Sequence, residues 1–159
     1  MHSDDTSVIT RRRWLGIALG GTAAALVTGA VPAFAAAPVA ITVYKDPSCG
    51  CCNKWVEHLR AHGFAVTTRD TADMDEVKDT FGVPAALRSC HTGTIGAYVI
   101  EGHVPADVIQ QLVHERATVA GLAVPGMVTG SPGMEGGTPQ PYDIIAYQRD
   151  GKTRVYGHR

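Results

Sequence analysis

Three of the four cysteines of this 159-residue chain stand within the short stretch "DPSCGCC", residues 46–52. Cys49 and Cys52 have the C-x-x-C spacing, which serves either thiol–disulfide exchange or the binding of soft metal ions such as Cu(I) and Zn(II). An exchange site uses one attacking and one resolving thiol, so it gains little from a third. A soft metal gains from each added thiolate, so Cys51 favours metal binding. Exchange chemistry and a purely structural disulfide remain the alternatives.

The fourth cysteine, Cys90, is followed directly by His91 in "SCHTG". If this segment returns to the point where the first helix begins, Cys90 completes a set of four thiols, and His91 offers an imidazole in addition. One thiolate can bridge two metal ions, so four together could hold more than one Cu(I). The alternative is that Cys90 is a small buried hydrophobic residue, a common fate of cysteine.

Three further residues are candidate ligands of the same ion or ions. His103 stands at the end of an expected strand in "EGHVP", and Met127 and Met134 each end a Pro-Gly-Met tripeptide. The Pro- and Gly-rich segment around these methionines cannot supply a regular buried face. Thioether sulfur is a soft, neutral ligand, so we consider both methionines candidates for lid or transfer ligands of copper.

The elements that must position these residues alternate between strand and helix. We expect strands over residues 39–45, 64–70 and 94–102, helices over 51–62, 72–82 and 105–116, a loop over 121–141 and a closing hairpin that turns at Asp150-Gly151. This order predicts an α/β sandwich with a mixed sheet and flanking helices. A first strand that runs directly into a cysteine-bearing helix is typical of the thioredoxin-like fold. The helix N-terminus also stabilises thiolates.

The first helix also carries His58 and His62, four residues apart. This spacing can pair two imidazoles on a metal ion. His58 is seven residues from Cys51, which is about 10 Å along a helix, so the two cannot share an ion. We therefore interpret the two histidines as part of an exposed polar face.

Residues 1–36 have the features of a signal peptide. The basic residues Arg11 to Arg13 precede an uncharged, Gly- and Ala-rich run that ends in an A-x-A pattern. The motif "TRRRWL" is similar to a twin-arginine export signal. A permanent transmembrane helix is the alternative, but the run would be a weak span. We predict removal of residues 1–36, which leaves residues 37–159 as one periplasmic domain without stable membrane insertion.

The charge of the remaining domain limits its partners. Residues 1–36 hold three arginines and two aspartates, so 14 basic residues become 11 and 15 acidic residues become 13. A near-neutral domain without a basic stripe argues against nucleic acid as a partner.

Four motifs, in this order, carry a resemblance to a known family: "CGCCNKWVEHLRAHGF", "GVPAALRSCHT", "GAYVIEGHVPAD" and "GLAVPGMVTGSPGME". They resemble small periplasmic proteins classed as a domain of unknown function, a family that includes the copper-resistance protein CopG. The third motif has Ala97 where we expect the family's glycine. The resemblance implies a thioredoxin-like copper-binding domain whose cluster ligands are Cys49, Cys51, Cys52 and Cys90, with copper that interconverts between Cu(I) and Cu(II).

Our leading prediction is a periplasmic Cu(I)-binding protein of copper resistance, which exchanges copper with other periplasmic copper-handling proteins. We favour a binding protein over an enzyme. The rival is a thiol–disulfide oxidoreductase that uses Cys49 and Cys52, although Ser48 stands where an aromatic residue would precede the first cysteine. A structural zinc domain is less favoured, and it would unfold on metal removal.

Overall fold

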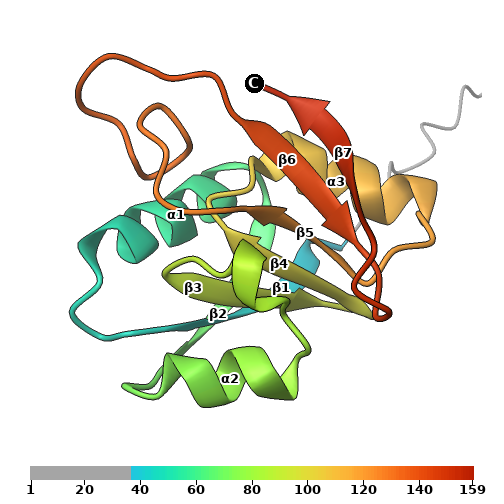
Figure 1. Ribbon diagram of the computed structural model, residues 1–159. Helices are drawn as coiled ribbons and strands as arrows, with labels where there is room; N and C mark the ends of the chain where they lie inside the picture. The colour runs from blue at the N-terminus through green and yellow to red at the C-terminus, as the bar shows by residue number, and fades with distance from the viewer. Residues whose placement is uncertain (1–36) are drawn as a thin grey trace, which may run out of the picture. The chain divides into compact units, whose positions relative to one another are not determined.

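The computed structural model describes residues 37–159, so the predicted signal peptide lies outside the described residues. Figure 1 shows a twisted sheet with helices packed on it. The sheet has seven strands in the order β2-β1-β3-β4-β5-β6-β7. Among the described residues, no helix is both long enough and apolar enough to span a bilayer.

The first unit has the predicted β-α-β form. It comprises β1 (Val39–Lys45), α1 (Gly50–Ala61) and β2 (Phe64–Asp70), and the two strands are parallel. The crossover helix makes this parallel pairing possible. Gly63 follows the end of α1 with φ of 84°, the left-handed conformation that glycine adopts most easily. Both strand predictions and the helix prediction are confirmed here.

The next unit differs from its prediction. After α2 (Met74–Thr80) and the short 3-10 helix η1 (Ala85–Leu87), the chain forms β3 (His91–Ile95) and β4 (Tyr98–Gly102) as an antiparallel hairpin. The prediction of one strand over residues 94–102 is therefore wrong. Gly96, with φ of 57°, turns the chain between the two strands. The hairpin is followed by α3 (Ala106–Glu115), as predicted.

The last unit extends the sheet. The expected loop over residues 121–141 begins with a strand, β5 (Gly121–Val124), which pairs in parallel with β4. The rest of this segment is a long connection, coloured orange in Figure 1, that leads to the predicted hairpin of β6 (Asp143–Tyr147) and β7 (Thr153–His158). Four apolar or small residues in a Gly- and Pro-rich region gave too weak a strand signal to separate from a loop.

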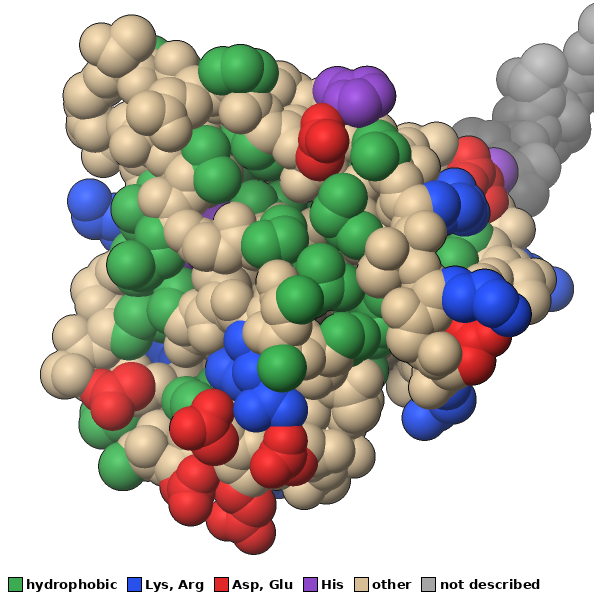
Figure 2. Space-filling view, viewed as in Figure 1, with side chains coloured by type: hydrophobic (Ala, Val, Ile, Leu, Met, Phe, Trp, Pro, Cys, Tyr) green, Lys and Arg blue, Asp and Glu red, His purple; other side chains and the backbone are tan. Residues whose placement is uncertain are grey.

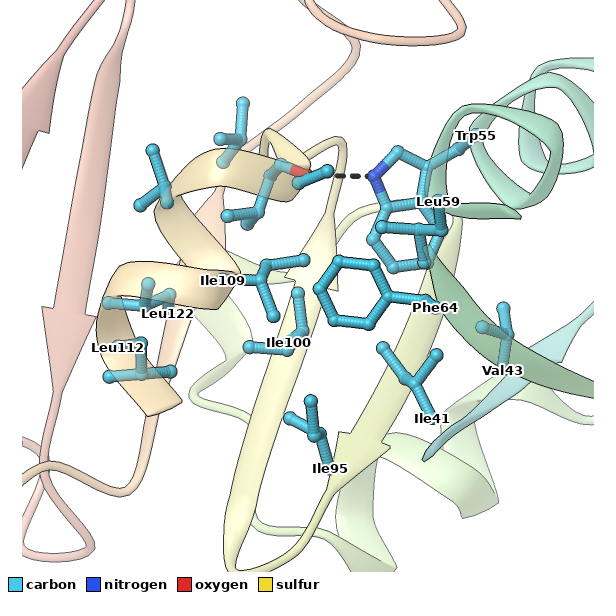
Figure 3. Close-up of a cluster of buried hydrophobic side chains, with 14 of the residues drawn as sticks. Ile41, Val43, Trp55, Leu59, Phe64, Ile95, Ile100, Ile109, Leu112 and Leu122 are labelled. Atoms are coloured by element: carbon cyan, nitrogen blue, oxygen red, sulfur yellow. Dashed lines mark hydrogen bonds between the residues drawn. The ribbon is translucent and has the colours of Figure 1, made fainter. Parts of the chain in front are cut away.

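The main core lies between the sheet and the two longer helices, α1 and α3. Figure 3 shows Trp55 and Leu59 of α1 and Ile109 of α3 pointing toward Phe64 and Ile100 of the sheet. The Trp55 indole N–H donates to the backbone oxygen of Val104 at 2.9 Å, so the ring is buried without an unpaired donor. This packing holds α1 against the sheet and fixes the place where its N-terminus, with the cysteines, must lie.

The other face of the sheet carries a smaller core of Val83, Leu87, Val99, Ala123 and Tyr147. In β4, Val99 lies next to Ile100 of the main core, and in β5, Ala123 lies between Leu122 and Val124 of the main core. Successive side chains of a strand point to opposite faces of the sheet, so Val99 and Ala123 belong to the other face. The neighbouring helix α2 is acidic on its surface, and Figure 2 shows these acidic side chains gathered at one end of the molecule.

These observations confirm the prediction of an α/β sandwich with a mixed sheet and flanking helices. The narrower assignment to the thioredoxin-like fold stays a prediction.

Candidate metal centre

The first three cysteines lie at the N-terminus of α1. Cys49 is the N-cap residue, and its backbone N–H donates to the oxygen of Asp46 at 3.1 Å, which closes the turn after β1. The first free N–H groups of the helix point toward this end, where they favour negative charge on sulfur. Cys49 and Cys51 are half-buried and Cys52 is fully buried. We call Cys49, Cys51 and Cys52 the thiol trio.

Strand pairing brings Cys90 to the thiol trio. β3 runs antiparallel to β1, and His91 is registered opposite Lys45, the last residue of β1. The residue before β3 therefore lies beside the turn that leads from β1 into α1. The Cys90 Sγ is 3.8 Å from the Cys51 Sγ, which is itself 3.5 Å from the Cys49 Sγ. The predicted convergence of the distant cysteine with the other three is present in the structure.

Cys49 and Cys52 are joined by a disulfide, with their Cα atoms 5.3 Å apart. Cys51 and Cys90 are free thiols. The sequence predicted four thiolates, whereas the structure holds two thiols beside one disulfide. A disulfide must gain two electrons before its two sulfurs can bind a metal as thiolates. The four-thiolate set therefore belongs to the reduced protein.

Two imidazoles lie on the other side of Cys90. His91 Nδ1 is 3.3 Å and His103 Nε2 is 3.2 Å from the Cys90 Sγ. We call His91 and His103 the imidazole pair. Both side chains are fully buried, and the His91 ring lies against the Trp55 ring with centroids 4.3 Å apart. The β3–β4 hairpin places the pair, because His91 begins β3 and His103 follows the end of β4.

The ligand atoms form two overlapping groups. The four cysteine sulfurs lie within 4.8 Å of one another, and so do the ligand atoms of Cys90, His91 and His103. Cys90 belongs to both groups. The first group offers sulfur alone, which suits Cu(I), and the second offers one sulfur and two imidazole nitrogens, which suit zinc or copper.

Burial shifts the pKa values of the centre. Burial, with the nearby Cys51 thiol, raises the pKa of Cys90 to about 12, so its thiol is protonated at neutral pH in the metal-free protein. Burial lowers the pKa of both His91 and His103, so both imidazoles are neutral at pH 7. A neutral imidazole can bind a metal without first losing a proton. His91 Nε2 is buried and has no hydrogen-bond partner among residues 37–159.

A buried ion pair that no sequence motif indicated supports this side of the centre. Glu101 Oε1 accepts from Lys78 Nζ and from the Ser89 backbone N–H, each at 2.6 Å, while Oε2 accepts from the Thr92 hydroxyl at 2.7 Å. Ser89 and Thr92 flank Cys90 and His91, so one carboxylate holds both ends of that segment. The only sequence signal was a charged residue inside the apolar run "YVIEG".

The two candidate methionines have different surroundings. Met127 is 59% exposed, whereas Met134 is half-buried on a turn that packs against α1. A side chain at the neighbouring Gly133 would collide with the Cys51 oxygen and the Trp55 nitrogen. The structure thus brings the second Pro-Gly-Met turn to the centre and leaves Met127 exposed.

His58 differs from its predicted role as part of an exposed polar face. Its side chain is half-buried, and Nε2 accepts from the backbone N–H of Ala106 at 3.1 Å. This N–H is one of the free donors at the start of α3, where Pro105 offers no side-chain cap. His58 therefore joins α1 to α3, and His62 remains exposed as predicted.

One protein-family model matches part of the chain. Residues 87–134, which include Cys90, both imidazoles and both Pro-Gly-Met turns, match a family described as "Protein of unknown function, DUF411". No curated protein matches the chain.

Two solved structures of the copper resistance protein CopG, Form 1 and Form 2, are similar to the chain. Each has 48% sequence identity and a TM-score of 0.73, and the match covers 77% of this chain and 98% of the CopG chain. This level of identity over nearly the whole length of CopG is that of members of one family. The chain belongs to the CopG family of copper resistance proteins.

Proposed function

We propose that this chain is an exported copper-binding protein that acts in copper resistance by holding Cu(I) in a multi-thiolate site. In this proposal, Cys49, Cys51, Cys52 and Cys90 supply thiolates, and His91 and His103 supply imidazoles. Met127 and Met134 act as lid or transfer ligands. The proposal combines the CopG relationship with the chemistry of the residues gathered at the end of α1.

One observation carries the proposal. The sulfur of Cys90, 38 residues after Cys52, lies within 4.8 Å of all three sulfurs of the thiol trio. Four sulfurs at one point exceed what thiol exchange needs, because exchange uses two. Soft Cu(I) is the ion that gains most from such a set.

The two ligand groups suggest more than one copper ion. Cys90 is shared, and a thiolate can bridge two metals. The sulfur group would hold Cu(I), and the mixed group of Cys90 and the imidazole pair could hold Cu(I) or Cu(II). Two electrons from an external dithiol would convert the Cys49–Cys52 disulfide into two thiolates, so the supply of such a reductant controls how many copper ions the protein holds.

Export completes the proposal. We infer that residues 1–36 act as a cleaved signal peptide, by a twin-arginine-like route, and that residues 37–159 work in the periplasm as one domain with a thioredoxin-like fold. The β1-α1-β2 unit followed by β3-β4-α3, with the cysteines at the start of α1, supports that fold. An oxidising periplasm is also the place where a Cys49–Cys52 disulfide persists.

The test is a copper titration of the purified, anaerobically reduced protein. We expect one or more Cu(I) ions per chain, and we expect Cys51→Ser to lower this stoichiometry sharply because Cys51 stands between Cys49 and Cys90. Ser48→Ala, next to the trio but without a metal ligand, is the matched control and should bind as the wild type does. Unchanged binding by Cys51→Ser would refute the proposal.

The disulfide itself favours a second candidate, a thiol–disulfide oxidoreductase. Cys49 is the more accessible partner, so an external thiolate would attack its sulfur and release Cys52. This candidate predicts that the protein reduces insulin disulfides in the presence of a dithiol, and that Cys51→Ser retains this activity. A protein that binds copper and leaves insulin oxidised excludes it.

A further inference from the structure

The tripeptide Pro-Gly-Met occurs twice in the connection between β5 and β6, and the two copies lie in different surroundings. Gly126 and Gly133 have similar backbone conformations, with φ of 74° and 86°. A Cβ atom at Gly126 would meet nothing within 4 Å, whereas a Cβ atom at Gly133 would lie 2.8 Å from the Cys51 oxygen and 2.9 Å from the Trp55 nitrogen. The second copy is therefore docked on α1 and the first is not.

The docked turn contacts His103 through its backbone. The Pro132 carbonyl oxygen lies 2.8 Å from His103 Nδ1. A carbonyl oxygen can only accept, so Nδ1 must carry the proton. A neutral imidazole has one N–H, so Nε2 keeps a free lone pair, and Nε2 is the atom that lies 3.2 Å from the Cys90 Sγ.

We propose that the Pro132-Gly133 turn is a positioning device that locks His103 in the tautomer with Nδ1 protonated, and so keeps Nε2 ready to bind a metal beside Cys90. The metal part of this inference rests on the proposed function. Hydrogen bonds of this kind, from the second ring nitrogen of a histidine to a carbonyl, fix both the tautomer and the orientation of the ring.

Close packing makes glycine necessary at position 133. The two atoms that a Cβ would strike belong to the backbone of α1, which cannot move aside as a flexible side chain can. The same Cβ would lie 3.3 Å from His103 Nδ1 itself. Any side chain here must lift the turn away from α1, and the Pro132 oxygen away from His103. The Gly133 N–H donates to Glu135 Oε1 at 2.8 Å, which holds the turn from its other side.

The experiment compares Gly133→Ala with Gly126→Ala as the matched control. Both substitutions place alanine at a positive φ, so they share the backbone cost, and only the first meets α1. The readout is the pair of ring ¹⁵N shifts of His103 in the metal-free protein, since a protonated and a bare imidazole nitrogen have clearly different shifts. We expect only the Nδ1-protonated tautomer in the wild type and in Gly126→Ala, and a mixture of tautomers in Gly133→Ala.

A wild-type His103 protonated on Nε2 would overturn the inference, and this holds even if Gly133→Ala does not fold. A folded Gly133→Ala with unchanged ring shifts would overturn it as well. A general loss of packing would instead change the ring ¹⁵N shifts of His103 equally in Gly133→Ala and Gly126→Ala. That result would also contradict a tautomer lock by the Pro132-Gly133 turn.

A second arm measures Cu(I) affinity by competition with a chelator. We expect Gly133→Ala to lose about 10–100-fold in affinity, the usual effect of removing an outer-shell partner of a ligand, and Gly126→Ala to lose far less. The two measurements distinguish failure of the proposed function from failure of the tautomer lock. A tautomer lock without copper binding by the wild type would contradict the proposed function alone, whereas copper binding of equal affinity in both variants would contradict the lock.

Discussion

The two sides of the candidate centre differ in how they are built. The thiol trio lies in one continuous stretch, and two of its three residues, Cys49 and Cys51, are half-buried. The imidazole pair is fully buried and comes from the two ends of a hairpin, and Glu101, paired with Lys78, accepts from the backbone N–H of Ser89 beside Cys90. Cys90 joins the two sides, within 4 Å of Cys51 and of both imidazoles.

The thiol trio can change its redox state through the Cys49–Cys52 pair, whereas the imidazole pair has no such chemistry. The Cys49–Cys52 disulfide lies within the thiol trio, so its reduction changes two ligands of that side and none of the imidazole pair. We infer that the buried side positions copper and that the accessible side sets how much copper the protein holds.

The largest effect is expected from Lys78→Met. Lys78 and Glu101 are buried partners at 2.6 Å, and loss of the cation leaves the carboxylate buried without its charge partner. Breaking a buried pair in this way typically costs about 3–5 kcal/mol. We expect a loss of this size in the free energy of unfolding of the metal-free protein, measured in urea.

The control for that experiment is Lys152→Met. Lys152 pairs with Asp150 at 2.7 Å, but its side chain is 83% exposed, and exposed pairs contribute only about 0.2–1 kcal/mol. Equal losses in the two variants would show that the buried pair does not support the imidazole side, and the division between the two sides would lose its structural basis.

A smaller effect is expected from pH on the apparent Cu(I) affinity. The thiols lose protons when they bind copper, whereas the neutral imidazoles do not. The pKa of Cys90 is raised to about 12, so copper must displace a thiol proton at neutral pH, while burial keeps the imidazoles neutral. Apparent Cu(I) affinity should therefore rise by roughly tenfold per pH unit for each thiol proton displaced, between about pH 6 and about pH 8. Chelator competition with proton-release measurements checks this, and an affinity independent of pH would contradict thiolate binding.

The sequence was informative where the signal was local. β1 and β2 have the predicted bounds, and Asp150-Gly151 turns the last hairpin as expected. The thiol trio could be predicted because its three cysteines are close together in the sequence. Gly96-Ala97 failed as a turn signal because it interrupts an apolar run by only two residues, which left one strand where the structure has two.

The remaining features depend on contacts between distant segments, which no local pattern encodes. From the sequence, Lys78 is one charged residue of an acidic helix, and only the fold shows that it pairs with Glu101. His58 looks like a surface residue until its ring meets the start of α3. Gly133 has the same neighbours in sequence as Gly126, so only packing distinguishes them. The C-x-x-C spacing indicated Cys49 and Cys52 as a possible disulfide pair, but spacing alone could not distinguish a disulfide from a metal site.

X-ray absorption at the copper edge tests the central claim most directly, on protein loaded with Cu(I) after anaerobic reduction and on protein loaded with the Cys49–Cys52 disulfide intact. The account predicts mainly sulfur ligands with a minority of imidazole nitrogen in the reduced protein, and a lower copper content with a larger nitrogen share in the disulfide form. Copper surrounded by nitrogen and oxygen alone, or equal copper content and ligands in both forms, would contradict it.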